Sequence, residues 1–458
     1  MPHRLLPRLL SGAALTLGAI AAIAARPSVA EPSVFPTGVT IYDPALAYNG
    51  YIVFAAPDHK TRLIDMDGNV VRQWDHAGFP SEILDPAVTH GSKGHLLVQL
   101  STIEGGGAGV VPNMPAEFNN KTIGELDWDG KTVWEWGKDA PGGGARQHHD
   151  WARLANGDTL VLANSYGPIA GFKLPNLLDD VIYQVTQKGK VAWEWHARDH
   201  LDEVGWTPEQ LALVKDAKNP DYLHFNNMTP LGPNKWFDAG DTRFAPDNIL
   251  VDSRNANFIA IIDRKTGKIV WTLGPNYPAI APGAKLPRTV DQISGQHDAH
   301  LIEPGLPGAG NLIVFDNQGE GGYPAVALGV NSGSRILEID PVKKEIVWQY
   351  TGENTGRPGW TFFSSFISSA RRLPNGNTLI DEGMNGRFFQ VTPAGKIVWE
   401  YVSPYFAQTP VGGGAGGSVT SNWVYRAQPV PYDWVPAGTP HTEKPVQPSN
   451  PADFHLPS

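Results

Sequence analysis

The sequence predicts an all-β, six-bladed β-propeller with four-stranded blades, because of two repeated phrases and a turn-rich composition. The chain has 458 residues, including 50 glycines, 40 prolines and 15 tryptophans, and only 18% of its residues are charged. Many turn formers and aromatic residues without long charged stretches are typical of folds built from short strands. A repeat protein of this length folds as one unit, since each repeat buries its faces against its neighbours.

The first repeated phrase reads as a hairpin that ends on tryptophan. A polar residue is followed by a Gly or Lys turn, an aliphatic residue and Trp, as in DMDGNVVRQW. Such turns between apolar runs favour a hairpin. A tryptophan at the same point of each copy predicts packing between blades rather than a cofactor stack, because a buried Trp covers a large area. The six copies end at Trp74, Trp134, Trp193, Trp271, Trp348 and Trp399.

The second phrase is an Asn-Gly-type turn followed by an apolar strand, and it lies between the tryptophan motifs. Two hairpins per blade give the four strands of a propeller blade. An early strand within residues 31–55 is expected to complete the last blade, which closes the ring and removes its edges. The copies of the second phrase are 91–100, 154–164, 231–240, 308–319 and 373–383.

The two ends of the chain read differently from the repeats. Residues 1–30 have a basic start, an apolar run and small residues before Ala30, so a signal peptide and a periplasmic or secreted protein are expected. A retained membrane anchor is the alternative, although the run is short for a span. The propeller is expected over residues 31–428, with an extended Pro-rich tail over 429–458. One helix is predicted at 207–217, capped by Thr207.

Charge and cysteine content exclude several function classes. The formal net charge is −10 without any basic block, which argues against a nucleic-acid partner. The chain has no cysteine, so it has neither a thiolate nucleophile nor a Cys-ligated metal. No stretch beyond the leader is long and apolar enough for stable membrane insertion. The oligomeric state stays open, and a homodimer is compatible with the sequence.

Polar residues recur at one position of the repeat, five residues before the aliphatic residues Leu154, Leu231, Ile302 and Leu373. In a propeller this segment enters the innermost strand, so matched residues of different blades converge on the central channel. His224 lies two residues before one of them, and His148 and His300 flank the others, so all three join the candidate site. The residues at the matched position are His149, Asn226, His297 and Ser368.

Arg254 follows His224 after one hairpin, in the segment VDSRNAN. A guanidinium presents a rigid fork of donors to tetrahedral oxyanions, so this residue is a candidate anion ligand. A surface or inter-blade salt bridge is the alternative. Metal ligation is a competing use of the histidines, but adjacent residues of a strand point to opposite faces, and no compact metal signature is present. We therefore predict neither a metal nor a cofactor.

Several of these segments together resemble the bacterial arylsulfotransferase family, over roughly residues 34–436. The resemblance lies in QHHDW (147–151), LHFNN (223–227), the run DSRNANFIAIIDRKTGKIVWTLGP (252–275) and GQHDAHLIEPGLPGAGNLIVFDN (295–317). The stretches SRILEIDP, SSFISSARRLPNGNTLI and GRFFQVTPAGKIVWEYVSPY add to it.

The resemblance implies a periplasmic propeller that moves a sulfuryl group from an aryl sulfate to a phenolic acceptor, by a ping-pong mechanism without a nucleotide cofactor. By motif, His297 matches the nucleophile that becomes a sulfohistidine, and His149 and His224 match the accompanying histidines. Arg254 matches the sulfate-binding arginine, with Asn226 as a further donor. Small-molecule phenols and aryl sulfates are then the partners.

The chain also departs from the family pattern. It has no cysteine pair and little room for the extra N-terminal domain that enterobacterial members carry, and an insertion separates His224 from Arg254. Arg335 and Arg387 therefore remain alternatives for the sulfate-binding arginine. A metal- or quinone-dependent propeller enzyme and a non-catalytic binding propeller remain alternative functions, because a fold does not determine a function.

Overall fold

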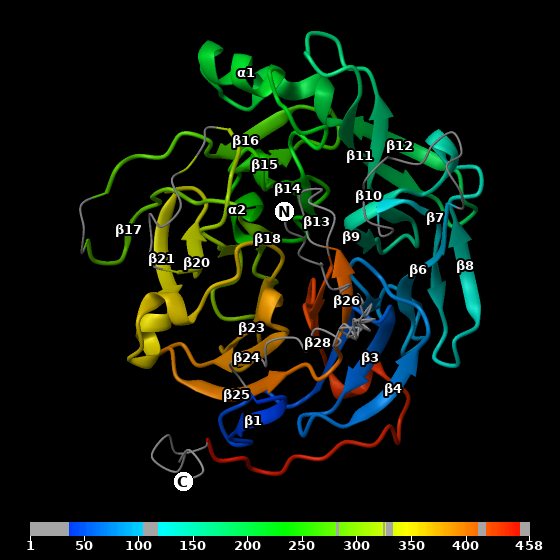
Figure 1. Cartoon of the computed structure of the whole chain (residues 1–458), viewed down its shortest axis with the longest axis vertical. Coiled ribbons are helices and arrows are strands. Elements are labelled where there is room, and N and C mark those ends of the chain that lie inside the picture. Colours follow the sequence, from blue (N-terminus) through cyan, green and yellow to red (C-terminus); the bar gives the residue numbers. More distant parts are fainter. Residues whose placement is uncertain are drawn as a thin grey trace, which may run out of the picture. The chain divides into compact units, whose positions relative to one another are not determined.

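The computed structural model describes residues 36–103, 118–280, 284–323, 326, 333–410 and 418–448. The leader expected at residues 1–30 lies outside these described residues. Within them, six antiparallel sheets follow one another around a ring, so the predicted six-bladed propeller is confirmed (Figure 1). The innermost strands contact one another around the axis. Each blade contains the outer hairpin that the tryptophan phrase predicts, but in the first blade the inner pair joins strands from opposite ends of the propeller sequence.

Each blade runs from an innermost strand at the axis to an outermost strand at the rim, in the order that follows. The first two blades are β28 (Ala427–Val430), β2 (Tyr51–Ala56), β3 (Lys60–Ile64), β4 (Val70–Trp74), and β5 (Glu82–Ile83), β6 (Leu96–Thr102), β7 (Asn120–Leu126), β8 (Thr132–Trp136). The third and fourth are β9 (Gln147–Arg153), β10 (Thr159–Gly167), β11 (Leu177–Val185), β12 (Val191–His196), and β13 (Phe225–Pro230), β14 (Ile249–Ser253), β15 (Phe258–Ile262), β16 (Ile269–Leu273). The last two are β18 (His297–Leu301), β19 (Leu312–Asp316), β20 (Arg335–Asp340), β21 (Glu345–Tyr350), β17 (Arg288–Thr289), and β22 (Ser369–Arg372), β23 (Thr378–Glu382), β24 (Arg387–Val391), β25 (Ile397–Val402), β1 (Gly38–Tyr42).

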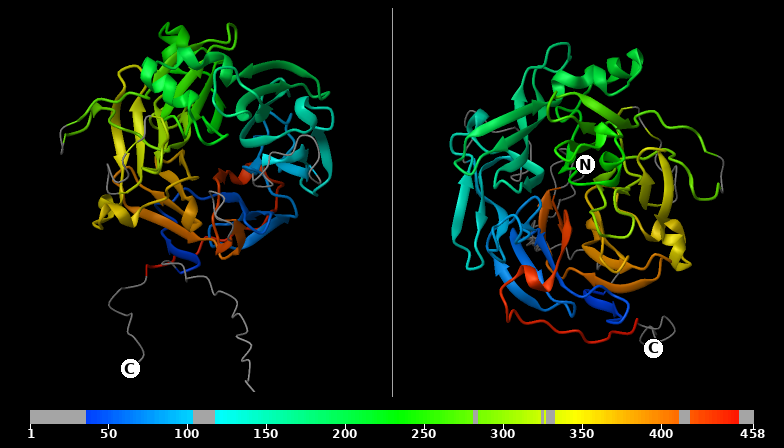
Figure 2. Two further views of the ribbon diagram at one scale, coloured as in Figure 1. Left: turned by 45° about the horizontal axis from the view of Figure 1, so that its top comes forward. Right: turned by 180° about the vertical axis from the view of Figure 1, so that it is seen from behind.

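Both ends of the propeller sequence close the ring. The N-terminal strand β1 joins the last blade as predicted, and it pairs with β25 as an additional outermost strand. The C-terminal strand β28 supplies the innermost strand of the first blade, pairing Val430 with Tyr51 and Ala427 with Phe54. The boundary predicted at residue 428 therefore falls inside β28. Beyond it, the described part of the tail passes outside the first blade and bridges back from Val446 to Tyr42 (Figure 2).

The repeated phrase ending on tryptophan forms the contact between neighbouring blades. The indole N–H donates to a carbonyl in the hairpin turn of the next blade: Trp271 to Pro341 O at 3.0 Å, and Trp399 to Met66 O at 2.8 Å. In the third blade Trp195, two residues after the repeated Trp193, makes this bond. The hydrophobic core accordingly consists of clusters that lie between neighbouring blades.

One copy of the second phrase does not form the predicted strand. Residues 231–240 contain the short helix α2 (Lys235–Asp238), because Asn234 caps it by accepting from the N–H groups of Trp236 and Phe237. The strand that follows β13 is β14, which begins later, at Ile249. The segment is thus an insertion between β13 and β14. After the last strand of the sixth blade, β26 (Ala407–Pro410) and β27 (Ser418–Ser421) pair as a separate two-stranded sheet.

The helix predicted at 207–217 is confirmed as α1 (Pro208–Lys215). Thr207 accepts from the N–H of Gln210, and the Gln210 side chain accepts from the N–H of Thr207, which forms a capping box. Among the described residues, no helix is long and apolar enough to cross a membrane.

Candidate functional site

The matched residues lie where the innermost strands are irregular. His149 and Asn226 lie within the register shifts of β9 and β13, His297 borders the register shift of β18, and Ser368 immediately precedes β22. The pairing shifts at this point, for example between Phe225 and Asn227. His149 has φ 58°, His224 has φ 55° and Ser368 has φ 93°. Such bulges redirect side chains, and here they bring histidines of different blades together at the axis.

Three imidazoles gather on the side of the third and fourth blades. The ring centroids of His149 and His224 are 4.5 Å apart. His148 Nδ1 lies 2.8 Å from His149 Nδ1, so the expectation that these neighbours point to opposite faces is wrong. The left-handed backbone at His149 interrupts the alternation of the strand. In the described residues, no set of three His, Cys, Asp or Glu side chains has the geometry of a metal site.

A small pocket opens beside these imidazoles. His224 Nδ1 lies 2.5 Å from Asp221 Oδ2, which orients its ring. Burial lowers the pKa of His148 to about 4, so His148 is neutral near pH 7. Burial also raises the pKa of Asp180, which lies 3.5 Å from His148 Nε2. The pocket is lined by Phe118, His148, His149, Asn164, Leu178, Asp180, Asp221 and His224.

His297, on β18, is held at both ring nitrogens. Its Nδ1 lies 2.8 Å from Asn317 Oδ1 and 3.0 Å from Gly295 O. Its Nε2 accepts a hydrogen bond of 3.1 Å from the backbone N–H of Ile367. Burial, followed by the nearby charge of Arg254, holds the pKa of His297 well below its usual value. His297 is therefore a neutral, oriented imidazole.

Arg254 lies next to His224 despite the insertion before it. Strands β13 and β14 pair up to Phe225 and Ser253, and the Arg254 N–H then donates to His224 O. Among the described residues the Arg254 guanidinium forms no ion pair, and it donates from Nη1 only to Asn255 Oδ1 at 3.0 Å. Its Nε is buried without a hydrogen-bond partner, and burial lowers the pKa of the group. Its positive charge is thus available to an anion.

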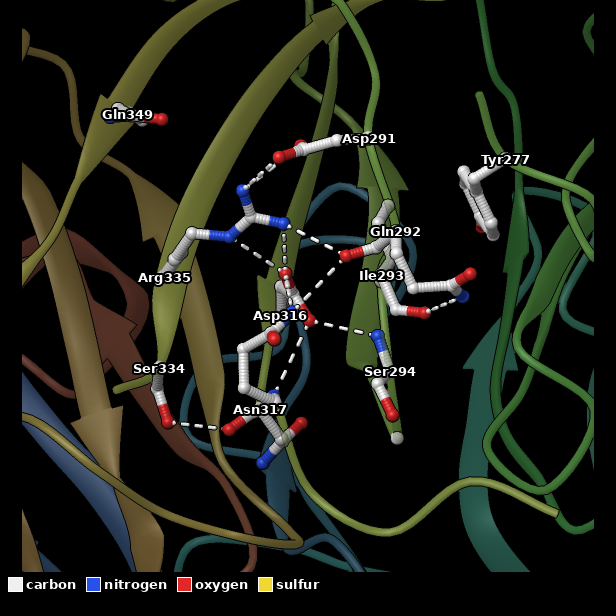
Figure 3. A network of polar contacts seen from close by, with 12 residues as sticks. Tyr277, Asp291, Gln292, Ile293, Ser294, Asp316, Asn317, Ser334, Arg335 and Gln349 are labelled. Carbon is white, nitrogen blue, oxygen red and sulfur yellow. Dashed lines mark hydrogen bonds and ion pairs between the residues drawn. The ribbon is translucent and has the colours of Figure 1, made fainter. Parts of the chain in front are cut away.

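The two alternative arginines are committed to carboxylates. Arg335 bonds Asp316 through Nε and Nη2, at 2.9 and 2.6 Å, and reaches Asp291 through Nη1 at 3.0 Å, as Figure 3 shows. Arg387 pairs with Glu382 at 2.8 Å and with Glu400. Both guanidinium groups are buried with these partners, so removing one partner would leave an unpaired buried charge in the fifth or sixth blade. Of the three candidates, Arg254 is the one whose guanidinium pairs with no carboxylate among the described residues.

The remaining predicted residues are placed at different points of the channel. Asn226 donates from Nδ2 to Gln296 O, and its buried Oδ1 has no hydrogen-bond partner. Ser368 donates to Ser364 Oγ and accepts from the Gly383 N–H, so its hydroxyl holds the local loop. His300 lies with Asp298, bonded to the Asp298 carbonyl oxygen at 2.8 Å.

Sequence reasoning missed the aromatic and charged residues contributed by the first and second blades. Tyr425 Oη lies 3.0 Å from His149 O and 2.8 Å from Asn226 O. Arg426 pairs with Asp150 at 3.0 Å and with Asp298 at 3.4 Å. Phe79 packs 4.8 Å from the His149 ring. Recognition of β28 as an innermost strand would have placed Tyr425 and Arg426 at the axis, because they immediately precede it.

The comparisons with known proteins point to one family. The family model described as arylsulfotransferase (ASST) matches residues 58–403. No protein of curated function matches the chain at a significant level. Solved structures show a distant similarity. A Bacteroides caccae protein of unknown function is 12% identical, with a TM-score of 0.45, over 84% of this chain and 99% of that chain. Virginiamycin B lyase from Staphylococcus aureus is 13% identical, with a TM-score of 0.35, over 81% of this chain and 85% of that chain. Because the family model covers most of the propeller and every histidine of the site, the chain belongs to the arylsulfotransferase family.

Proposed function

We propose that this protein transfers a sulfuryl group from an aryl sulfate to a phenolic acceptor by a ping-pong mechanism through sulfated His297. The observation that carries the proposal is an arginine without an ion pair, Arg254, beside the neutral imidazole of His297. A neutral imidazole is a nucleophile and a guanidinium stabilises sulfuryl oxygens, so the pair supplies what the transfer needs.

In the first half-reaction, the Nε2 lone pair of His297 attacks the donor sulfur. A bond forms between Nε2 and sulfur, and the bond between sulfur and the aryl oxygen breaks. The leaving phenolate takes a proton from His224, whose other nitrogen is bonded to Asp221. For this attack the Ile367 N–H, which donates to Nε2 in the resting site, must release the Nε2 lone pair. Arg254 balances the negative charge on the sulfuryl oxygens.

The second half-reaction reverses these steps with a new phenol. His224 accepts the phenolic proton, the acceptor oxygen attacks sulfur, and the bond between sulfur and His297 Nε2 breaks. The proton lost by His224 in the first half is regained in the second, so the cycle is balanced without a further reactant. We propose accordingly that the donor itself supplies the activated sulfuryl group and that no nucleotide cofactor takes part.

The test is to incubate the protein with an aryl sulfate in the absence of any acceptor, and then to measure intact mass and map peptides. We expect a mass increase of one sulfuryl group on His297, with release of one equivalent of phenol. The modification should disappear when a second phenol is added, with formation of its sulfate ester. The proposal is wrong if His297→Ala retains full activity, or if the sulfuryl group is found on another residue.

A matched control is His300→Gln. This histidine directly follows the bulge of β18 and is also buried, but its Nδ1 lies 2.8 Å from the Asp298 carbonyl oxygen. His300→Gln should therefore retain phenol release and sulfation of His297.

A further inference from the structure

Asn317, at the end of β19, contacts His297 and the loop that covers it. Its Oδ1 lies 2.8 Å from His297 Nδ1. Its Nδ2 donates to Ser364 O at 2.7 Å and to Ile367 O at 2.9 Å. Asn317 and His297 are almost completely buried, so water does not substitute for these bonds.

These contacts fix the orientation of the Asn317 amide. Two carbonyl oxygens face Nδ2, and carbonyl groups only accept hydrogen bonds. Rotating the amide by half a turn would place Oδ1 against both carbonyls and lose two bonds in a buried site. Oδ1 is therefore the atom that faces His297, and it accepts a hydrogen bond from the imidazole Nδ1–H.

The imidazole tautomer follows from this orientation. Nδ1 faces two acceptors, Asn317 Oδ1 and Gly295 O, whereas Nε2 faces a donor, the Ile367 N–H. Only a neutral ring with its proton on Nδ1 satisfies every contact. The opposite tautomer would direct the Nδ1 lone pair at two oxygens and the Nε2 proton at an N–H group.

We infer that Asn317 is the positioning residue that selects the Nδ1–H tautomer of His297 and so keeps the Nε2 lone pair available for attack on sulfur. The tautomer assignment stands on geometry alone, whereas its catalytic consequence rests on the proposed function. Asn317 touches neither substrate nor sulfur in this role. It acts through His297, as a carboxylate or amide commonly orients a catalytic imidazole.

Asn317 also couples the imidazole to the loop above it. Ile367 has φ 56° and Ser368 has φ 93°, and neither residue favours a left-handed backbone. The bond from Asn317 to Ile367 O helps to hold this loop, and the same residue presents its N–H to Nε2. The Asn317 amide therefore acts on both ring nitrogens of His297. It accepts from Nδ1–H, and it helps to hold the Ile367 N–H against Nε2.

The experiment compares wild-type protein with Asn317→Ala by side-chain ¹⁵N NMR, with the His297 signals assigned by their loss in His297→Gln. The wild type should show a protonated Nδ1 and an unprotonated Nε2 at neutral pH. In Asn317→Ala the ¹⁵N chemical shifts of both His297 ring nitrogens should move toward the values of a mixture of tautomers or of the Nε2–H tautomer. Its kcat should fall on the order of 10² to 10⁴-fold, as in other enzymes whose catalytic imidazole is held in the wrong tautomer. The KM for the aryl sulfate should change little, because Arg254 is retained.

Asn248→Ala is the matched control. Asn248 is also buried, donates from Nδ2 to Arg243 O and accepts from the Arg264 N–H, but it lies away from the axis. It should leave the His297 signals and kcat unchanged. A wild-type ring protonated on Nε2, or unchanged signals in Asn317→Ala, would overturn the inference.

The outcomes separate this inference from the proposed function. A shifted tautomer in Asn317→Ala together with no sulfuryl transfer by the wild type upholds the tautomer assignment and overturns the proposed function. Sulfuryl transfer with unchanged kcat in a folded Asn317→Ala upholds the proposed function and overturns the positioning role. The wild-type spectrum alone tests the tautomer if Asn317→Ala does not fold.

Discussion

Arg254 and Arg335 should respond in opposite ways to the same substitution. Arg335 is buried against Asp316, which is 0% exposed, and Arg335→Ala leaves that carboxylate without its cation. Breaking a buried pair from one side costs about 3–5 kcal/mol of the free energy of unfolding. Arg254→Ala removes one hydrogen bond to a neutral oxygen and breaks no ion pair, so it should cost less than about 1 kcal/mol.

The activities should show the reverse order. Arg254→Ala removes the positive donors that face the sulfuryl oxygens, which should lower kcat/KM on the order of 10² to 10³-fold. Arg254→Lys keeps the charge without the planar fork, so its loss should be intermediate. Arg335→Ala should retain activity per folded molecule at low temperature. The checks are urea unfolding followed by Trp fluorescence and steady-state kinetics with an aryl sulfate and a phenol. Equal stability losses in the two Ala variants, or full activity in Arg254→Ala, would refute the reasoning.

Three further predictions follow from burial and charge. Trp399→Phe should lower the free energy of unfolding by about 1–3 kcal/mol, because Met66 O loses its donor in a dry interface; Trp348→Phe, whose bond to Pro393 O is exposed, should cost clearly less in the same urea titration. The pKa of His148 is lowered to about 4 in the folded protein, so His148 of the unfolded chain binds a proton first as pH falls. Between pH 6.5 and pH 4 this difference should lower the free energy of unfolding by about 3 kcal/mol. His148→Gln should make the free energy of unfolding depend less steeply on pH in that range, as measured by urea unfolding at several pH values. The pKa of His297 is also lowered, so the neutral nucleophile persists on acidification, and the acid limb of kcat/KM that it sets should lie well below pH 6.5 in a pH–rate profile.

The blade architecture could be predicted because its signals are local. A hairpin turn and a tryptophan a few residues away are both visible in the sequence, and six copies fix the number of blades. The strand β28 escaped prediction because its sequence AQPV contains Pro429, which usually argues against a strand. As an innermost edge strand, β28 pairs only with β2, so a missing N–H on its open side costs no ladder bond.

The histidines of the site could be predicted from their matched positions, but their contacts could not. Strand alternation would separate His148 from His149, and only the left-handed backbone at His149 brings their nitrogens together. The choice among the three arginines depends on partners distant in sequence, since Asp291 and Asp316 reach Arg335 from other segments. The spacing of residues in the sequence does not show which carboxylates pair with Arg335.

The matched position combines the reaction site with the closure of the ring. The residue that follows three of the matched residues, His149, Asn226 and His297, binds the innermost strand of the next blade. Asp150 accepts from the Met228 N–H at 3.0 Å, and Asp298 accepts from the Ala370 N–H at 3.1 Å. His149 and His297 therefore sit one residue away from a bond between blades, and any rotation of one blade against the next would move both imidazoles. A site assembled from separate blades gains its precision from these bonds, because rigid elements hold functional groups more accurately than loops do. Replacing Asp150 or Asp298 should thus lower the proposed activity by displacing His149 or His297, although neither carboxylate touches the transferred group.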